Sequence, residues 1–271
     1  MKSRNPTLAH VIQSQDRGFA TAVASLGDEV FVVREDSQTR IEVYDAVTFA
    51  LHHEIAVPGL GKCPKGLAAC PSNRCLYASD CENNSVHRVK LSGSNAVKKL
   101  KVAGDPAGLS VNKAYNLVVA CKAANTLLEY TTHGSLVRQI PVQAGPKPSH
   151  AVQLSNGDYA LCQGTSPGVL SVVGVDGQVA SSYRQTSDGR QMKCPRGLAV
   201  TKNDDILVAD ALNDRILLIL RSTGCAQELD LPVDVGIQAP WSLCLDESRG
   251  RLYVGEWSGR HRVLVFGGVS L

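Results

Sequence analysis

The chain contains the stretch Pro195-Arg196-Gly197-Leu198-Ala199-Val200, which continues with Ile206-Leu207-Val208-Ala209-Asp210 and then with Asn213-Asp214-Arg215-Ile216. A polar segment, Asn203-Asp204-Asp205, separates the first two apolar runs. Short apolar runs joined by a polar turn are typical of a β-hairpin. A third apolar run begins at Ile216, so the stretch predicts three consecutive short antiparallel strands.

Copies of this stretch recur along the whole chain at intervals of about 45 residues. Each begins with a proline two residues before a small residue, at Pro64, Pro106, Pro148, Pro195 and Pro240, and a degenerate copy begins at Phe19. A fourth apolar run follows in most copies, and a four-stranded unit of this size cannot bury both of its faces alone. Six such units predict an all-β fold, a six-bladed β-propeller of four-stranded antiparallel blades, as one domain over residues 1–271.

The two ends of the chain indicate how the ring closes. Only five residues follow the third apolar run of the last unit, Val263-Leu264-Val265-Phe266, which is too few for a fourth strand. Residues 8–12 form an apolar run that precedes the first unit and has no partner in it. We expect this N-terminal strand to complete blade six and so remove an open sheet edge.

Composition excludes several classes of protein. The chain has 271 residues with 44% hydrophobic and 20% charged residues and a net charge of +3, which is typical of a globular domain. No apolar run approaches the roughly 18 residues of a membrane span, and no secretory signal is visible. The nine cysteines form no C-x-x-C pair. We therefore expect a cytoplasmic monomer with reduced thiols and no membrane contact.

The copy that begins at Pro195 closely resembles the NHL repeat, which reads roughly P-x-G-(I/L)-A-V, then Y-V-A-D, then N-x-R-I. The unit with Pro64 to Leu67, Asp80 and Asn83-Asn84-Ser85-Val86 is a good second copy. The WD dipeptide and a recurring double glycine are absent, which argues against WD40 and kelch propellers. The resemblance implies a recognition module, as in tripartite-motif ligases and RNA-binding regulators, although related six-bladed propellers such as gluconolactonase are enzymes.

One face of the predicted ring collects the candidate binding residues. In a four-stranded blade the loop before the first strand and the loop after the second strand lie at the same end. The cationic and aromatic residues of these loops are Lys65, Lys122, Lys147, Lys193, Arg196, Trp241 and Trp257. Cations beside tryptophans suit single-stranded RNA or an acidic peptide. The alternative interpretation is that they are solvated loop residues and partly packed tryptophans.

Charge is distributed unevenly along the chain. Residues 61–125 hold ten Lys and Arg against three acids, a net charge of +7, whereas the remaining residues have a net charge of −4. This basic sector covers blades two and three and can steer an anionic partner toward them. The run Lys98-Lys99-Leu100-Lys101 is expected to be part of an outer strand, where lysines protect an exposed edge.

An enzymatic alternative would need a central metal. Asp80, Asp210 and Glu256 occupy equivalent positions near the expected channel mouth, and carboxylate ligands suit calcium. The lactonase-type families add a Glu from the first blade and an Asn from an entry loop, where this chain has Gly18-Phe19-Ala20 and Ser149-His150. The sequence therefore favours a non-enzymatic module without a cofactor that binds a protein or RNA, with a calcium-dependent lactonase-like hydrolase as the alternative.

Overall fold

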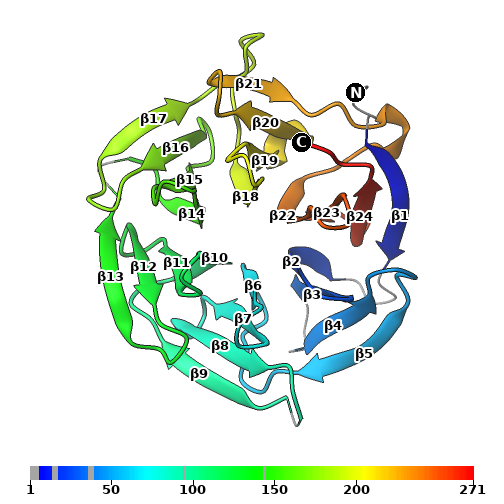
Figure 1. The fold of residues 1–271 in the computed structure, drawn as a ribbon, viewed down its shortest axis with the longest axis vertical. Helices are drawn as coiled ribbons and strands as arrows, with labels where there is room; N and C mark the ends of the chain where they lie inside the picture. The colour runs from blue at the N-terminus through cyan, green and yellow to red at the C-terminus, as the bar shows by residue number, and fades with distance from the viewer. Residues whose placement is uncertain (1–5, 14–17, 36–39, 94, 143–144) are drawn as a thin grey trace.

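Six four-stranded antiparallel sheets are arranged in a ring around a central axis (Figure 1). The structure is a computed structural model that describes residues 6–13, 18–35, 40–93, 95–142 and 145–271. In blades one to five the strands follow the chain order from the axis to the rim. The predicted six-bladed propeller of four-stranded blades is confirmed.

The strands of the blades have the following bounds. Blade one contains β2 (Phe19–Leu26), β3 (Glu29–Glu35), β4 (Arg40–Asp45) and β5 (Leu51–Ala56), and blade two contains β6 (Leu67–Cys70), β7 (Cys75–Asp80), β8 (Ser85–Lys90) and β9 (Val97–Lys101). Blade three contains β10 (Pro106–Val111), β11 (Leu117–Cys121), β12 (Thr126–Tyr130) and β13 (Leu136–Pro141), and blade four contains β14 (Pro148–Gln153), β15 (Tyr159–Gln163), β16 (Val169–Val173) and β17 (Val179–Tyr183). Blade five contains β18 (Pro195–Val200), β19 (Ile206–Asp210), β20 (Arg215–Leu220) and β21 (Cys225–Glu228), and blade six contains β22 (Pro240–Asp246), β23 (Arg251–Glu256), β24 (Arg262–Gly267) and β1 (Thr7–Gln13).

Helical structure in the described residues is limited to two short 3₁₀ segments, Ala211–Asn213 and Val233–Val235. Within those residues, no helix has the length and apolar character needed to cross a membrane.

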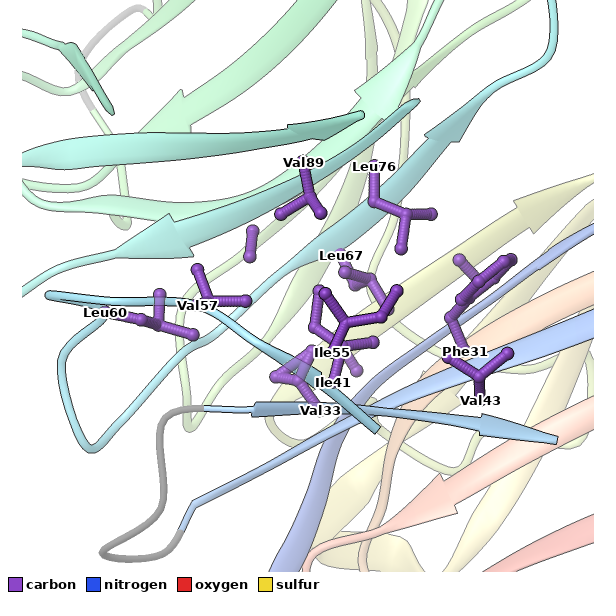
Figure 2. Close-up of a cluster of buried hydrophobic side chains, with 13 residues drawn as sticks. Phe31, Val33, Ile41, Val43, Ile55, Val57, Leu60, Leu67, Leu76 and Val89 are labelled. Atoms are coloured by element: carbon purple, nitrogen blue, oxygen red, sulfur yellow. The ribbon is translucent and has the colours of Figure 1, made fainter. Parts of the chain in front are cut away.

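The blades are held together by apolar side chains that interdigitate between neighbouring sheets. Between blades one and two, Phe31 and Ile41 from one sheet belong to the same buried cluster as Leu67, Leu76 and Val89 from the other (Figure 2). Burying a side chain of this kind contributes about 1.5–3 kcal/mol. Since each sheet needs a neighbour on both sides, the favourable arrangement is a closed ring.

The ring closes through the N-terminal strand. β1 pairs antiparallel with β24, and the register places Val11 opposite Leu264 and Ile12 opposite Val263. Ile12 is only 1% exposed. The prediction that residues 8–12 complete blade six is confirmed, with the strand extending to Thr7 and Gln13.

The recurring glycine of the Pro-x-Gly motif is required by the close approach of neighbouring inner strands. A Cβ atom on Gly66 would lie 2.5 Å from the carbonyl oxygen of Ala107, in the inner strand of blade three. A Cβ atom on Gly197 would lie 2.7 Å from the Leu243 nitrogen in blade six. Because backbone atoms cannot move aside as a flexible side chain can, a larger residue at either position would push two blades apart.

The closing strand provides a matched pair of substitutions. Ile12→Ala removes buried apolar atoms and is expected to lower the free energy of unfolding by about 2–5 kcal/mol. Leu8→Ala, on the same strand at a residue that is 38% exposed, is expected to cost less than about 0.5 kcal/mol. Urea unfolding measures the free energy of unfolding of both variants.

Deletion of residues 1–13 removes the whole closing strand and should lower the melting temperature by many degrees. An unchanged melting temperature would show that the ring does not depend on this strand.

Candidate functional site

A small cavity on the axis receives residues from the inner strands of all six blades. Its volume is about 40 Å³. The position after the motif proline contributes Lys65 from blade two, Arg196 from blade five and Trp241 from blade six. The repeat pattern predicts loops for these residues, but Arg196 and Trp241 are the second residues of β18 and β22. They reach the mouth of the cavity because the inner strands begin there.

His150 stands in blade four at the position that glycine occupies in blades two, three and five. Its Nδ1 accepts a hydrogen bond from the Leu198 backbone N–H at 2.9 Å. Its Nε2 therefore carries the proton and donates to the Leu109 carbonyl oxygen at 3.0 Å. The imidazole thus joins the inner strands of blades three, four and five, in space that a Cβ atom on Gly108 would fill.

The only sequence signal for this role was the histidine that replaces glycine in one copy of the motif. Burial lowers the pKa of His150 to about 4, although the hydrogen bond to Leu109 opposes the shift. The imidazole is therefore neutral at physiological pH, and it completes a polar bridge between blades and carries no charge into the cavity.

A cluster of charged and aromatic residues surrounds the cavity, and we call it the mouth cluster. It consists of Glu35, Lys65, Lys122, Arg196, Trp241 and Trp257. The Arg196 guanidinium lies 4.5 Å from the ring centroid of Trp241, and the ring centroids of Trp241 and Trp257 are 5.0 Å apart. Cation–π contacts contribute about 0.5–2 kcal/mol. Five of the seven candidate residues belong to this cluster.

Glu35 anchors one side of the mouth cluster. Its Oε2 accepts hydrogen bonds from Lys65 Nζ at 3.2 Å and from Trp257 Nε1 at 3.1 Å. Burial disfavours the charged carboxylate, but the hydrogen bond from Trp257 and the charge of Lys65 outweigh it and lower the pKa of Glu35. Sequence reasoning missed this residue. The sequence feature that could have identified Glu35 is its spacing in the repeat. It follows Phe19 by 16 residues, as Glu256 follows Pro240 by 16 residues.

Lys122 and Arg196 bring two positive charges to the mouth, and the nearby acid that acts on Lys122 is Asp105. Among the described residues, no carboxylate forms an ion pair with either side chain, and Arg196 Nε donates to the Cys194 sulfur at 3.1 Å. Burial and then the charge of Arg196 lower the pKa of Lys122, against the opposing charge of Asp105. In blade three the register pairs Pro106 with Cys121, where blades one, five and six have an acid and blade four has a glutamine. The mouth can therefore accept an anionic group.

Two of the predicted binding residues lie apart from the cavity. Lys147 is exposed, and its backbone carbonyl accepts a hydrogen bond from the Gly164 backbone N–H. Lys193 is also exposed and lines a separate surface hollow with Arg190 and Arg215. Both residues are on the predicted face, but the structure does not bring their side chains into the mouth cluster.

The three acids of the calcium alternative do not form a common site. Asp80 accepts hydrogen bonds from Asn83, Ser85 and His87, the last at 3.1 Å, all within blade two. Asp210 and Glu256 are likewise occupied within their own blades, by Arg215 at 2.8 Å and by Arg262. Each of these carboxylates instead fastens the loop and third strand of its own blade, and none of the three is in the group of potential ligand atoms found in the described residues.

One group of potential metal ligands was found in the described residues, and it is in blade one. Glu29, His52 and His53 have side-chain ligand atoms within 4.8 Å of one another. They belong to β3 and β5 of blade one, and both histidines are exposed at the rim. This group is separate from the axial cavity.

Comparison with known proteins agrees with the repeat and the fold. Residues 238–266 match the family model described as the NHL repeat. No curated protein sequence matches the chain. Similar solved structures include a streptogramin B lyase (13% identity, TM-score 0.70, 98% of this chain and 99% of that chain). A hydrazine synthase of Kuenenia stuttgartiensis is similar over 96% of this chain and 98% of that chain (15% identity, TM-score 0.68).

A third similar structure is a catalytically inactive virginiamycin B lyase from Staphylococcus aureus with quinupristin. It has 12% identity and a TM-score of 0.68, over 97% of this chain and 88% of that chain. At sequence identities of 12–15%, these similarities support the fold and say nothing about activity.

The neutral His150 bridge predicts a pH dependence of stability. Because the folded pKa of about 4 lies below the usual value of 6.5, protonation favours the unfolded chain. The contribution of His150 is intact above pH 6.5 and is lost as the pH falls toward 4, by about 3 kcal/mol in total. His150→Gln has no titrating ring, so the difference in unfolding free energy between the native protein and the variant should shrink between pH 7 and pH 4.5. A constant difference would contradict the bridge.

Proposed function

We propose that this six-bladed β-propeller, in which residues 238–266 match the NHL repeat, is a non-enzymatic recognition module that binds an acidic segment of a partner protein at the mouth cluster. One observation carries this proposal. Lys122 and Arg196 bring two positive charges without an ion-paired acid, in the described residues, to a cavity shared by all six blades. Both side chains are partly buried, and a partly desolvated positive site of this kind is stabilised by an anion from outside the chain.

The size of the cavity limits what can enter it. One water molecule needs about 10–15 Å³, so a cavity of about 40 Å³ holds a few waters or one group as small as a carboxylate or a phosphate. A nucleobase is too large. The group that enters is therefore small and anionic, and the rest of the ligand lies across the surrounding face.

The arrangement of the tryptophans favours a protein ligand over RNA. Single-stranded RNA is held by successive bases that stack on successive aromatic rings. Here Arg196 and Trp257 both lie against Trp241. Of the two tryptophans, only Trp257 is strongly exposed, with 40% of its surface accessible. One exposed indole, which itself packs against Phe19 and Trp241, can contact one planar or apolar side chain next to an acidic residue, whereas a run of bases needs several rings.

The basic sector supports an acidic partner through long-range attraction. Residues 61–125 have a net charge of +7, and the predicted lysine-rich run is confirmed as the outer strand β9. Lys98, Lys99 and Lys101 are exposed on that strand at the rim of blade two. Such a field raises the rate of encounter with anionic partners and weakens with added salt.

The proposal assigns no catalytic role to the mouth cluster. The lyases and the hydrazine synthase resemble the chain at 12–15% identity, which carries the architecture and not the chemistry. His150, the titratable group at the base of the cavity, is engaged through both ring nitrogens with backbone groups. It is therefore not poised to transfer a proton to a ligand.

A pair of double variants tests the site. The probes are a fluorescently labelled polyglutamate peptide and labelled poly(U) RNA, titrated at low and high salt. Hydrogen bonds to charged groups contribute about 1.5–3 kcal/mol each, so Lys122→Gln with Arg196→Gln should weaken peptide binding by about 100-fold or more. The matched control, Lys147→Gln with Lys193→Gln, makes the same charge change on the same face outside the cluster and should change affinity less than about threefold.

The outcomes separate the alternatives. Equal losses in the two double variants would show that net charge alone binds the peptide and would refute the mouth cluster as a site. Tight binding of poly(U) with none of the peptide would replace the protein partner by RNA. Trp257→Ala should weaken peptide binding by a smaller, salt-independent factor, because stacking does not depend on counterions.

A further inference from the structure

Two cysteines of blade two lie together beside the mouth cluster. Cys63 is in the loop that enters the blade, and Cys81 directly follows β7. The Cys81 thiol donates a hydrogen bond to the Cys63 backbone carbonyl at 3.3 Å. Both residues are partly exposed and both are free thiols. Their sulfur atoms are close enough to interact and are accessible to small solutes.

Charged neighbours of the pair come from three blades. Lys65 and Glu35, which form an ion pair at 3.2 Å, both interact with the Cys63 sulfur, and Asp105 of the next blade acts on Cys81. A hydrogen bond from Cys81 lowers the pKa of Cys63 to about 7 against the effect of burial, with Lys65 assisting and Glu35 opposing. The same contact raises the pKa of Cys81. One thiol of the pair is thus activated and the other stays protonated.

Other cysteines in the chain differ from this pair in their surroundings. Burial raises the pKa of Cys121 to about 12 and that of Cys244 to about 11. Cys70 and Cys75 face each other in register across a hairpin, but both are fully buried. Reaction with a solute needs both access and a thiolate, and the Cys63–Cys81 pair combines them with an adjacent partner.

We propose that Cys63 and Cys81 form a redox-sensitive dithiol that hydroperoxides oxidise to a disulfide, independently of any ligand of the mouth cluster. The Cys63 thiolate attacks the terminal oxygen of the peroxide, an S–O bond forms, the O–O bond breaks, and the leaving alkoxide or hydroxide takes a proton from solvent. The Cys81 sulfur then attacks the Cys63 sulfur. An S–S bond forms, the S–O bond breaks, and hydroxide leaves with the proton of Cys81 as water. The dithiol loses two electrons, and the peroxide gains them.

Peptide mapping tests the proposal. Reduced protein is treated with one equivalent of hydrogen peroxide, the remaining thiols are alkylated, and the linkages are read by tandem mass spectrometry. The expected product is a disulfide between Cys63 and Cys81 that dithiothreitol reverses. In Cys81→Ser the expected product is a sulfenic acid on Cys63, trapped by dimedone. In Cys63→Ser neither product is expected, and circular dichroism confirms that each variant is folded.

Cys225 provides the matched control, because it is also partly exposed but has no neighbouring thiol in register on β21. Cys225→Ser should leave formation of the disulfide unchanged. Oxidation of Cys63 no faster than that of Cys225 would overturn the proposal, as would a disulfide that joins any other two cysteines.

The pH dependence of alkylation gives an independent readout. The rate of iodoacetamide reaction at Cys63 should reach half its maximum near pH 7, matching its pKa. Lys65→Gln removes a neighbouring positive charge and should move that midpoint to higher pH. A midpoint near 9 in the unmodified sequence would show that Cys63 is an ordinary thiol.

Discussion

The inner strands of the six blades approach one another so closely around the axis that the backbone of one blade occupies the space where the next would place a side chain. Gly66 and Gly197 meet this constraint by having no Cβ atom. His150 meets it differently, because its ring fills the space beside Gly108 and bonds to the strands on both sides. The preceding position of the motif is not subject to this constraint, so it can hold long side chains such as Lys65 and Arg196, which both line the axial cavity.

The acidic residues at the ends of the second strands also follow the repeat, with exceptions in some blades. The acid that ends a second strand is used within its own blade, as in Asp210 with Arg215, and therefore adds no free charge to the face. Blade one departs from this pattern because Glu35 bonds to side chains of blades two and six. Blades three and four also depart, because Cys121 and Gln163 stand in place of the acid, and in blade three Lys122 follows. The candidate site is therefore formed in part by residues that depart from the repeat, such as Glu35 and Lys122.

Lys65 connects the mouth cluster with the dithiol. Its ammonium group lies 5.9 Å from the ring of Trp241 and forms an ion pair with Glu35, and it also contacts the Cys63 sulfur. Desolvation of these groups is tolerable because they neutralise one another. A change in the charge of Cys63 therefore alters the electrostatic surroundings of the tryptophan pair, so the redox state of the dithiol and the binding face share one residue.

The sequence by itself determined the six blades, their strands and the closing role of residues 8–12. The apolar runs and turns that predict them are local patterns that recur in every unit, and the Pro-x-Gly motif marks blades two, three and five. The sequence also determined which face carries the cations, since strand direction places equivalent loops at one end. Only the tertiary structure decided that Arg196 joins Trp241 while Lys193 lies apart. It likewise revealed that Glu35 contacts Trp257, 222 residues away in the chain. Such contacts depend on side-chain direction and on the spacing of separate blades, which no local pattern records.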